Sequence, residues 1–165
     1  MLTGSFASAY HGEPRATQDI DLIIAATTEQ VRELAGLLPE DEYYFDLDDA
    51  LEAVRRQSMF NIIDLQTGWK LDFILRKPVP FEIAKFERRI AVDYNGNTLF
   101  IATAEDIIIS KLEWSKAGES ERQLRDAAGI LKIRNDIDRA YVEGWVATLD
   151  LRPQWATAKI LAGLK

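Results

Sequence analysis

Two aspartates alternate with apolar residues in the segment Asp19-Ile20-Asp21-Leu22-Ile23, a pattern typical of a β-strand. Side chains two positions apart on a strand project to the same face, so the two carboxylates are predicted to lie side by side. Because aspartate is depleted in strands, two aspartates in one apolar strand indicate a specific role for the pair. Paired carboxylates bind hard divalent cations, which prefer oxygen ligands; ordinary ion pairing at a strand end is the alternative.

A third acid and a Gly-Ser pair extend this pattern. Asp72 lies in a second strand-like run, residues 70–75, and Gly4 and Ser5 precede the first strand by a short helical stretch. Gly4 would let the backbone approach a phosphate, and amides at the start of the following helix would bind its oxygens. An ordinary turn followed by a helix cap is the alternative. Three acids beside such a turn predict metal-assisted chemistry at a phosphate, in which Asp72 completes the cluster and helps to deprotonate an acceptor hydroxyl.

The composition limits the kind of metal site and the compartment. The chain has 165 residues, enough for one domain or for one domain with a small helical appendage. With no cysteine and one histidine, it excludes disulfides, thiolate metal sites and a multi-histidine zinc site within one chain. We therefore expect Mg²⁺ or Mn²⁺ as the cofactor, held by carboxylates. No apolar run approaches the length of a membrane span and no leader begins the chain, which predicts a cytoplasmic protein without a membrane partner.

The charge distribution bears on nucleic-acid partners. The formal net charge of −7 argues against broad non-specific binding of nucleic acid. Basic residues nevertheless gather in the middle third of the chain, at Arg55, Arg56, Arg76, Lys77, Lys85, Arg88 and Arg89. A local nucleic-acid face and ordinary solvated surfaces both explain this cluster, and the sequence leaves the two open.

The periodicity predicts a mixed α/β part, residues 1–102, followed by a helical part, residues 103–165. The first part is expected to contain helices at 5–11, from Thr27, at 46–56 and at 81–86, and strands at 19–25, 60–65, 69–75, 89–94 and 98–102. Asn95-Gly96 is a strong hairpin signal. Thr103 is an expected helix cap, and three further helices are expected near 120–132, 136–148 and 153–163.

Two expectations concern the end of the first helix. Gly12 is expected to close that helix in the left-handed conformation, which glycine adopts without steric cost. His11 is the only histidine, so it is a candidate general base. No serine or cysteine motif accompanies it, and a capping or exposed histidine is the preferred interpretation.

The combined pattern resembles a known superfamily. Gly-Ser, thirteen intervening residues and then Asp-x-Asp in an apolar setting resembles the nucleotidyltransferase superfamily related to DNA polymerase β. The stretch from residue 3 to about residue 25 looks most like the small bacterial AbiEii-type toxin nucleotidyltransferases and related families. The resemblance implies an α+β fold, with a mixed, mainly antiparallel sheet packed on helices and a C-terminal helical subdomain.

The same resemblance implies roles for residues outside the acid cluster. In the AbiEii-like toxins a helix lysine and a later helix aspartate belong to the active site, and Lys111 and Asp126 match them. Lys111 would bind the nucleotide phosphates, although a lysine extending to solvent is the alternative. Arg15, just before the first acid, is expected either to contact phosphate or to pair with one of the cluster acids; a structural role is equally open.

The resemblance implies transfer of a nucleotidyl group from a nucleoside triphosphate to a hydroxyl of an RNA end, a protein or a small molecule. A toxin-like role would add an antitoxin or a second copy of the chain as partner. The alternative is a non-catalytic nucleotide-binding or antitoxin-like module with the same fold. One feature speaks for this alternative: relatives usually carry a helix before the Gly-Ser turn, and this sequence shows none there.

Overall fold

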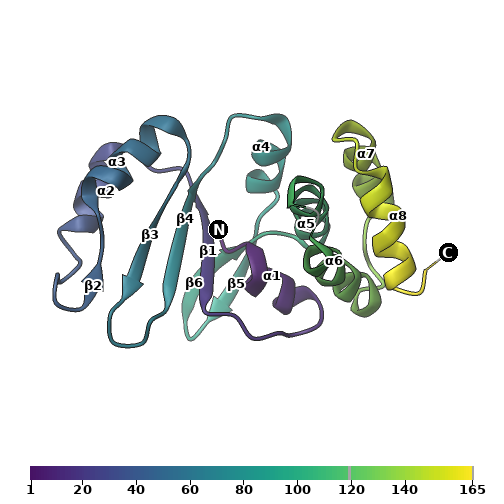
Figure 1. Ribbon diagram of the computed structural model, residues 1–165, viewed down its shortest axis with the longest axis horizontal. Helices are drawn as coiled ribbons and strands as arrows, with labels where there is room; N and C mark the ends of the chain where they lie inside the picture. The colour runs from purple at the N-terminus through teal and green to yellow at the C-terminus, as the bar shows by residue number, and fades with distance from the viewer. Residues whose placement is uncertain (119, 165) are drawn as a thin grey trace.

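The computed structural model describes residues 1–118 and 120–164, and its centre is a four-stranded mixed sheet (Figure 1). The strand order is β1-β4-β3-β2. The strands are β1 (Asp19–Ile24), β2 (Tyr43–Tyr44), β3 (Met59–Asp64) and β4 (Lys70–Leu75). β1 and β4 are parallel, and the other two pairs are antiparallel. The parallel pair places two strands that are far apart in the sequence side by side.

The first residues of the chain extend this sheet. Thr3 donates its amide to the Asp21 carbonyl, and Leu2 donates its amide to the Phe100 carbonyl. Residues 1–3 therefore lie between β1 and a second, two-stranded sheet of β5 (Ile90–Tyr94) and β6 (Asn97–Ile101). This connection fixes the start of the chain, and with it the Gly-Ser turn, directly beside β1.

The helices cover the sheet on two sides (Figure 1). On one side lie α2 (Thr28–Ala35) and α3 (Leu47–Arg56). The other elements are α1 (Gly4–His11), α4 (Pro80–Glu87), α5 (Ala104–Gly118), α6 (Glu121–Ile133), α7 (Arg139–Thr148) and α8 (Arg152–Leu161). In the order shown from left to right, α1, α5 and α6 follow the sheet, and α7 and α8 lie outermost. Among the helices of the described residues, none is long and apolar enough to cross a membrane.

Two hydrophobic clusters hold these layers together. The smaller one joins α2 and α3 to the sheet, where the Phe60 and Phe73 rings stack 5.1 Å apart. The larger one surrounds α5, whose Ile107, Ile108 and Ile109 are almost completely buried. A helix that is buried over most of its surface requires neighbours on several sides, and α1, α6, α7 and α8 provide them. This cluster also includes Ala7, Phe81 and Ile101 from the first 102 residues, so it joins the two predicted parts of the chain. The division of the chain into two parts at residue 102 stays a prediction.

The fold class predicted from the sequence is confirmed, and several local signals are confirmed with it. Thr27 and Gln30 form a capping box at the start of α2. Thr103 accepts a hydrogen bond from the Asp106 amide at the start of α5. Asn95 and Gly96 both have positive φ in the β5–β6 turn, as a type I′ hairpin requires. The short edge strand β2 was not predicted, because two residues carry no period.

Gly12 closes the first helix as predicted, and its amide donates to the Ser8 carbonyl, but the left-handed conformation predicted for it and the prediction for His11 are wrong. Gly12 has φ −140°, so it is not left-handed. Glycine is needed there because a Cβ would lie 2.7 Å from the Ile130 backbone nitrogen, where α1 meets α6. His11 is buried rather than exposed, and its Nε2 donates to the Ala102 carbonyl over 2.8 Å. Both residues serve the packing of α1 against the helical half.

Candidate functional site

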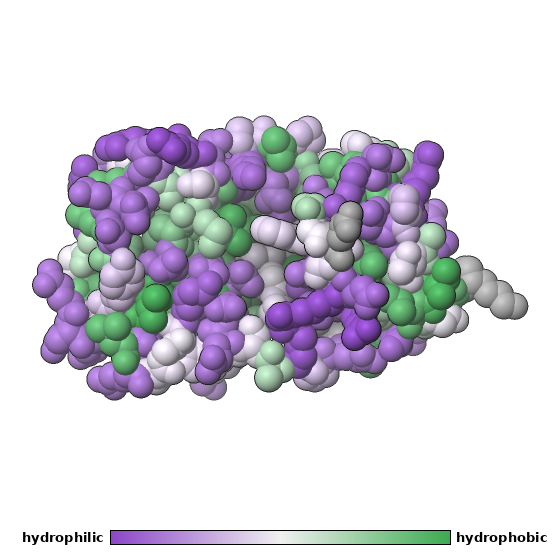
Figure 2. Space-filling view, in the orientation of Figure 1, coloured by the Kyte–Doolittle hydropathy of each residue, from purple (hydrophilic) through white to green (hydrophobic). Residues whose placement is uncertain are grey.

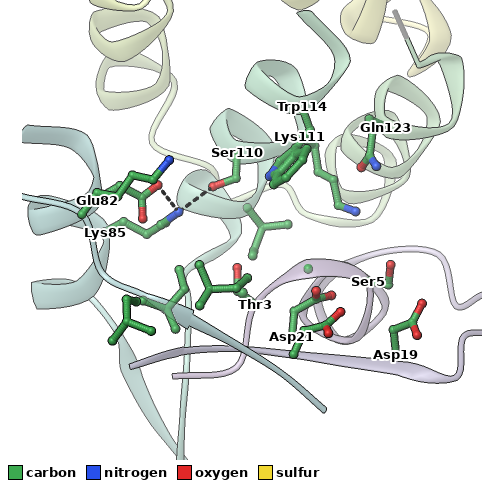
Figure 3. Close-up of a pocket in the computed structure, with 17 residues that line it drawn as sticks. Thr3, Ser5, Asp19, Asp21, Glu82, Lys85, Ser110, Lys111, Trp114 and Gln123 are labelled. Carbon is green, nitrogen blue, oxygen red and sulfur yellow. Dashed lines mark hydrogen bonds and ion pairs between the residues drawn. The ribbon is translucent and has the colours of Figure 1, made fainter. Parts of the chain in front are cut away.

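A pocket of about 320 Å³ lies between the sheet, the start of α1 and the helices α4, α5 and α6 (Figure 3). The surface in Figure 2 is recessed between the sheet and the helical half, and apolar side chains gather over the strands on its left side. Six of the eight predicted site residues line the pocket: Gly4, Ser5, Asp19, Asp21, Asp72 and Lys111. The other two, Arg15 and Asp126, lie behind it.

The three predicted acids project from one face of the β1–β4 pair. Asp21 is the direct register partner of Asp72 across the two parallel strands, and Asp19 lies one pleat further along β1. Asp72 is buried, with its side chain 8% exposed, whereas the Asp19 side chain is 56% exposed. The cluster therefore has a buried inner pair and one outer carboxylate open to solvent.

Burial raises the pKa of Asp21 above its usual value, and the nearby Asp72 adds to this shift. A hydrogen bond from the Ser5 amide and the charge of Lys111 act in the opposite direction. A carboxylate in this environment is destabilised in its charged form, so positive charge brought to the pocket is favoured.

Gly4 packs its backbone against the Asp21 carboxylate. Gly4 has φ +60°, a left-handed conformation, and a Cβ at this position would overlap with Asp21 Oδ2, Cγ and Cβ. Only glycine allows both the conformation and the contact. The turn predicted from Gly4-Ser5 is thus built directly onto the predicted acid strand.

Lys111 reaches from α5 toward the side of the pocket where Ser5 and Asp21 lie (Figure 3). Its ammonium donates to Asp126 Oδ2 on α6 over 2.8 Å. Lys111 is buried, and this burial lowers the pKa of its ammonium despite the ion pair with Asp126. Lys111 therefore lines the pocket as a buried residue and does not extend into solvent, contrary to the alternative interpretation.

Arg15 completes a chain of contacts behind the pocket. Its Nε lies 3.1 Å from Asp126 Oδ1, and its Nη2 donates to the Ser5 hydroxyl. Arg15 thus pairs with Asp126 and not with an acid of the Asp19, Asp21 and Asp72 cluster. The successive contacts Ser5–Arg15, Arg15–Asp126 and Asp126–Lys111 connect the Gly-Ser turn to α6 and α5.

Lys70 was missed in the sequence. Its ammonium lies 2.9 Å from Asp72 Oδ2 and 3.6 Å from Asp19 Oδ1. The hydrogen bond to Asp72 is the main cause of a raised pKa of Lys70. The signal was available, because Lys70 is two residues before Asp72 on the same strand and therefore shares its face.

The pocket also contains residues that carry no sequence signal. Trp114, one helical turn after Lys111, is 63% exposed, and Gln123 contributes a buried side-chain oxygen that has no hydrogen-bond partner. Neither position belongs to a motif, and only the packing of α5 beside α6 brings them to the acids.

The donor chemistry of the site fits a hard divalent cation. Asp72 Oδ1 is buried without a hydrogen-bond partner, which leaves an oxygen available inside the pocket. Its neighbours Asp21 and Asp19 add carboxylates on the same face. In residues 1–118 and 120–164, however, no three acidic or histidine side chains already lie close enough to hold a metal ion. Binding therefore requires the carboxylates to move together.

The basic cluster of the middle third does not form one free cationic face. Arg55 and Arg56 both pair with Glu52, Lys85 pairs with Glu82, and Arg88 pairs with Glu105 and Asp106. Most of these charges are thus neutralised by acids of their own or neighbouring helices. Locally paired charges, with Lys85 buried rather than solvated, fit this pattern better than a continuous nucleic-acid face.

Comparisons with known proteins bear on the fold. No protein-family model matches the chain, and no curated protein matches its sequence. The chain is similar to the crystal structure of an antigenic nucleotidyltransferase-like protein from Paracoccidioides brasiliensis, with a TM-score of 0.55 and 14% identity over 95% of this chain and 82% of that chain. At this identity the likeness shows the fold, which is nucleotidyltransferase-like. The closer resemblance to AbiEii-type toxins stays a prediction.

Proposed function

We propose that this chain transfers a nucleotidyl group from a nucleoside triphosphate to a hydroxyl acceptor in a reaction that depends on Mg²⁺ or Mn²⁺. The observation that carries the proposal is the pairing of Asp21 with Asp72 across β1 and β4, at a pocket that Lys111 also lines. The Gly4 backbone pressed against Asp21 joins this acid pair to a phosphate-binding type of turn. The nucleotidyltransferase-like fold supports the same interpretation.

The triphosphate would bind at the start of α1. Backbone amides at a helix N-terminus attract phosphate oxygens, and Gly4 and Ser5 at the start of α1 line the pocket. Lys111 faces the same side of the pocket and would contribute a positive charge (Figure 3). Asp126 and Arg15 do not line the pocket, and we assign them to positioning Lys111 and the Ser5 turn.

Asp19, Asp21 and Asp72 would hold the divalent cation. When bound, the cation would neutralise charge on the α-phosphate and favour ionisation of the attacking hydroxyl. The acceptor oxygen forms a bond to the α-phosphorus, the bond to the bridging oxygen of the β-phosphate breaks, and pyrophosphate leaves. Asp72, whose Oδ1 is free of protein partners, would accept the hydroxyl proton.

The toxin-like part of the resemblance favours an RNA end as the acceptor. The Lys111–Asp126 ion pair supports this resemblance, because the resemblance places both residues in the active site. We propose an RNA end as the first acceptor to test, with a protein side chain or a small molecule as the alternatives. A toxin of this type would have an antitoxin or a second copy of the chain as its partner.

The position of the transferred label tests the reaction. The chain is incubated with each nucleoside triphosphate labelled at the α-phosphate or the γ-phosphate, with Mg²⁺ or Mn²⁺ and with transfer RNA, total protein or small hydroxyl compounds. We expect α-label in an acceptor and no γ-label. The Asp21→Asn variant should remain folded, because burial already disfavours the charged form of Asp21, and it should give no product. Transfer of γ-label, or labelling by Asp21→Asn at the wild-type rate, contradicts the proposal.

A second candidate is a nucleotide-binding module without catalysis. The observation that favours it is the Lys70 ammonium, which already binds Asp72 and lies near Asp19. If these carboxylates serve only as ion-pair partners, the triphosphate binds and is not turned over. Calorimetry with triphosphate and Mg²⁺, followed by a pyrophosphate assay over the same acceptors, separates the two functions. Binding without pyrophosphate release in any acceptor mixture supports the module.

A further inference from the structure

The Lys70 ammonium lies between two of the candidate metal ligands. Its distances are 2.9 Å to Asp72 Oδ2 and 3.6 Å to Asp19 Oδ1. The strand register explains this position, because Lys70 is opposite Asp19 on β1 and two residues before Asp72 on β4. The three side chains therefore project from the same face. An ammonium here supplies the positive charge that a divalent cation would supply to the same oxygens.

The two carboxylates depend on that charge to different degrees. The Asp19 side chain is 56% exposed and is solvated without Lys70. Asp72 is buried, and its Oδ1 has no hydrogen-bond partner, so its Oδ2 contact with Lys70 carries most of its stabilisation. A buried carboxylate without a cationic partner is costly. The protein therefore tolerates Asp72 without a metal because Lys70 is beside it.

Lys70 can withdraw without disturbing the pocket. Its side chain is 35% exposed, and it is not among the residues that line the pocket. A lysine has a flexible stem and a strongly hydrated charge, so moving its ammonium into water has a low cost. Once it leaves, Asp72 requires another cation.

We propose that Lys70 is a built-in counter-ion that a divalent cation must displace from Asp19 and Asp72 before the three carboxylates converge. The inference rests on the proposed function, because it takes these acids to be metal ligands. It accounts for the absence of a converged metal-binding group among the described residues. Lys70 is then a positioning residue that sets the cation concentration at which the site assembles.

Binding of Mn²⁺ to the protein without nucleotide tests the displacement directly. Free Mn²⁺ is followed by electron paramagnetic resonance for the wild type, Lys70→Met and Lys77→Met. Lys77 lines the same pocket, and the structure shows no ion pair between it and Asp19 or Asp72, so its variant controls for the general loss of one positive charge. We expect Lys70→Met to bind Mn²⁺ roughly two- to fivefold more tightly than the wild type, as loss of a partly exposed competing ion pair implies. The Lys77→Met change should be smaller.

Thermal unfolding gives a second readout. In the presence of a chelator, Lys70→Met should unfold at a lower temperature than the wild type, because Asp72 is left without its partner. Added Mn²⁺ should then raise the midpoint of Lys70→Met more than that of the wild type, since a cation that binds only the folded state stabilises it. A purely structural role of Lys70 predicts the lower midpoint without the tighter binding.

Two further variants keep the test decisive if Lys70→Met does not fold. Lys70→Gln keeps a hydrogen-bond donor for Asp72 without the charge and should also bind Mn²⁺ more tightly. Lys70→Arg keeps the charge and should bind no more tightly than the wild type. Unchanged or weaker binding by the folded neutral variants overturns the displacement and leaves metal-dependent transfer standing. No Mn²⁺ binding by any variant overturns both the displacement and the metal site of the proposed function.

Discussion

The Gly4 backbone lies so close to the Asp21 carboxylate that no side chain fits between them, and φ of Gly4 is +60°. The turn and the acid strand are also tied by the Thr3 amide, which donates to the Asp21 carbonyl over 2.9 Å. The two sequence signals, Gly-Ser and Asp-x-Asp, are thus parts of one structural unit. A change at Gly4 should act on the acid cluster through direct contact.

Gly4→Ala should destabilise the protein and abolish triphosphate binding. The left-handed conformation costs an alanine about 1–2 kcal/mol, and overlap with Asp21 adds about 1–3 kcal/mol unless the carboxylate moves. Urea unfolding measures the stability and calorimetry measures the binding. Gly68→Ala is the matched control, because Gly68 has φ +72° and a Cβ there meets nothing within 4 Å. If both variants bind triphosphate as the wild type does, the close contact of Gly4 has no part in the site.

Lys111→Ala should weaken triphosphate binding or turnover by roughly tenfold to more than a hundredfold, as loss of a charge-assisted contact worth about 1.5–3 kcal/mol implies. Asp126 keeps Arg15 as a partner, so the variant should still fold. Lys111→Arg should restore only part of the effect, because a planar guanidinium does not reproduce a compact ammonium.

Lys116→Ala is the control for the Lys111 experiment. Lys116 also lies on α5, its side chain is more exposed than that of Lys111, and it pairs with Asp150 away from the pocket. Its loss should change binding by less than about twofold, within the range of ordinary surface substitutions. Equal triphosphate affinities of Lys111→Ala and Lys116→Ala would remove the toxin-like assignment of Lys111.

His11 should make the protein less stable as the pH falls. Burial lowers the pKa of His11 below its usual value of about 6.5. Its Nδ1 is buried without a hydrogen-bond partner, so a protonated Nδ1 would have no acceptor for its N–H. Between this lowered value and about 6.5 the unfolded chain binds a proton that the folded chain does not, so the free energy of unfolding decreases as the pH falls through that window.

The comparison with His11→Gln isolates this effect. Glutamine keeps a donor for the Ala102 carbonyl and does not titrate. Urea unfolding of both proteins at several pH values should give a steeper pH dependence for the wild type, by at most about 1.4 kcal/mol per pH unit. Parallel curves through the window would show that His11 has an ordinary pKa in the folded protein.

Tyr141→Phe should cost about 1–3 kcal/mol of stability. The Tyr141 hydroxyl donates to Asp106 Oδ1 over 2.7 Å, and Asp106 is completely buried at the start of α5. Removing the hydroxyl leaves a buried carboxylate oxygen without this donor. Tyr94→Phe is the control, since Tyr94 is 64% exposed on the β5–β6 hairpin and should change the stability little. Equal stabilities of the two variants would contradict the role of this buried hydrogen bond.

The sequence predicted those parts of the site whose chemistry is local. The alternation around Asp19 and Asp21 and the Gly-Ser turn each lie within a few residues, and period and turn chemistry identify them. Asp72 was found as a third acid on a strand, but its pairing with Asp21 depends on the parallel β1–β4 register, which no local pattern determines.

The parts that the sequence did not predict are set by contacts between distant segments. Gly12 ends α1 as predicted, but glycine is needed there because α6 approaches its Cα and not because of a left-handed conformation. His11 is buried by the end of β6 and the start of α5, far along the chain. The strand period places Lys70 on the same face as Asp72, but its position opposite Asp19 depends on the β1–β4 register. In each case tertiary packing determines the contact that local sequence rules do not specify.

Pyrophosphate release by matched acid variants tests the central claim most directly. Asp19→Asn, Asp21→Asn and Asp72→Asn each remove one candidate ligand, and Asp93→Asn removes an exposed acid on β5 as the control. Each protein is first shown to be folded by thermal unfolding. Pyrophosphate and labelled acceptor are then counted with Mn²⁺ and a nucleoside triphosphate. We predict equal amounts of pyrophosphate and labelled acceptor for the wild type and Asp93→Asn, and neither product above background for the three cluster variants. Turnover by folded Asp21→Asn and Asp72→Asn at the rate of Asp93→Asn would contradict the account.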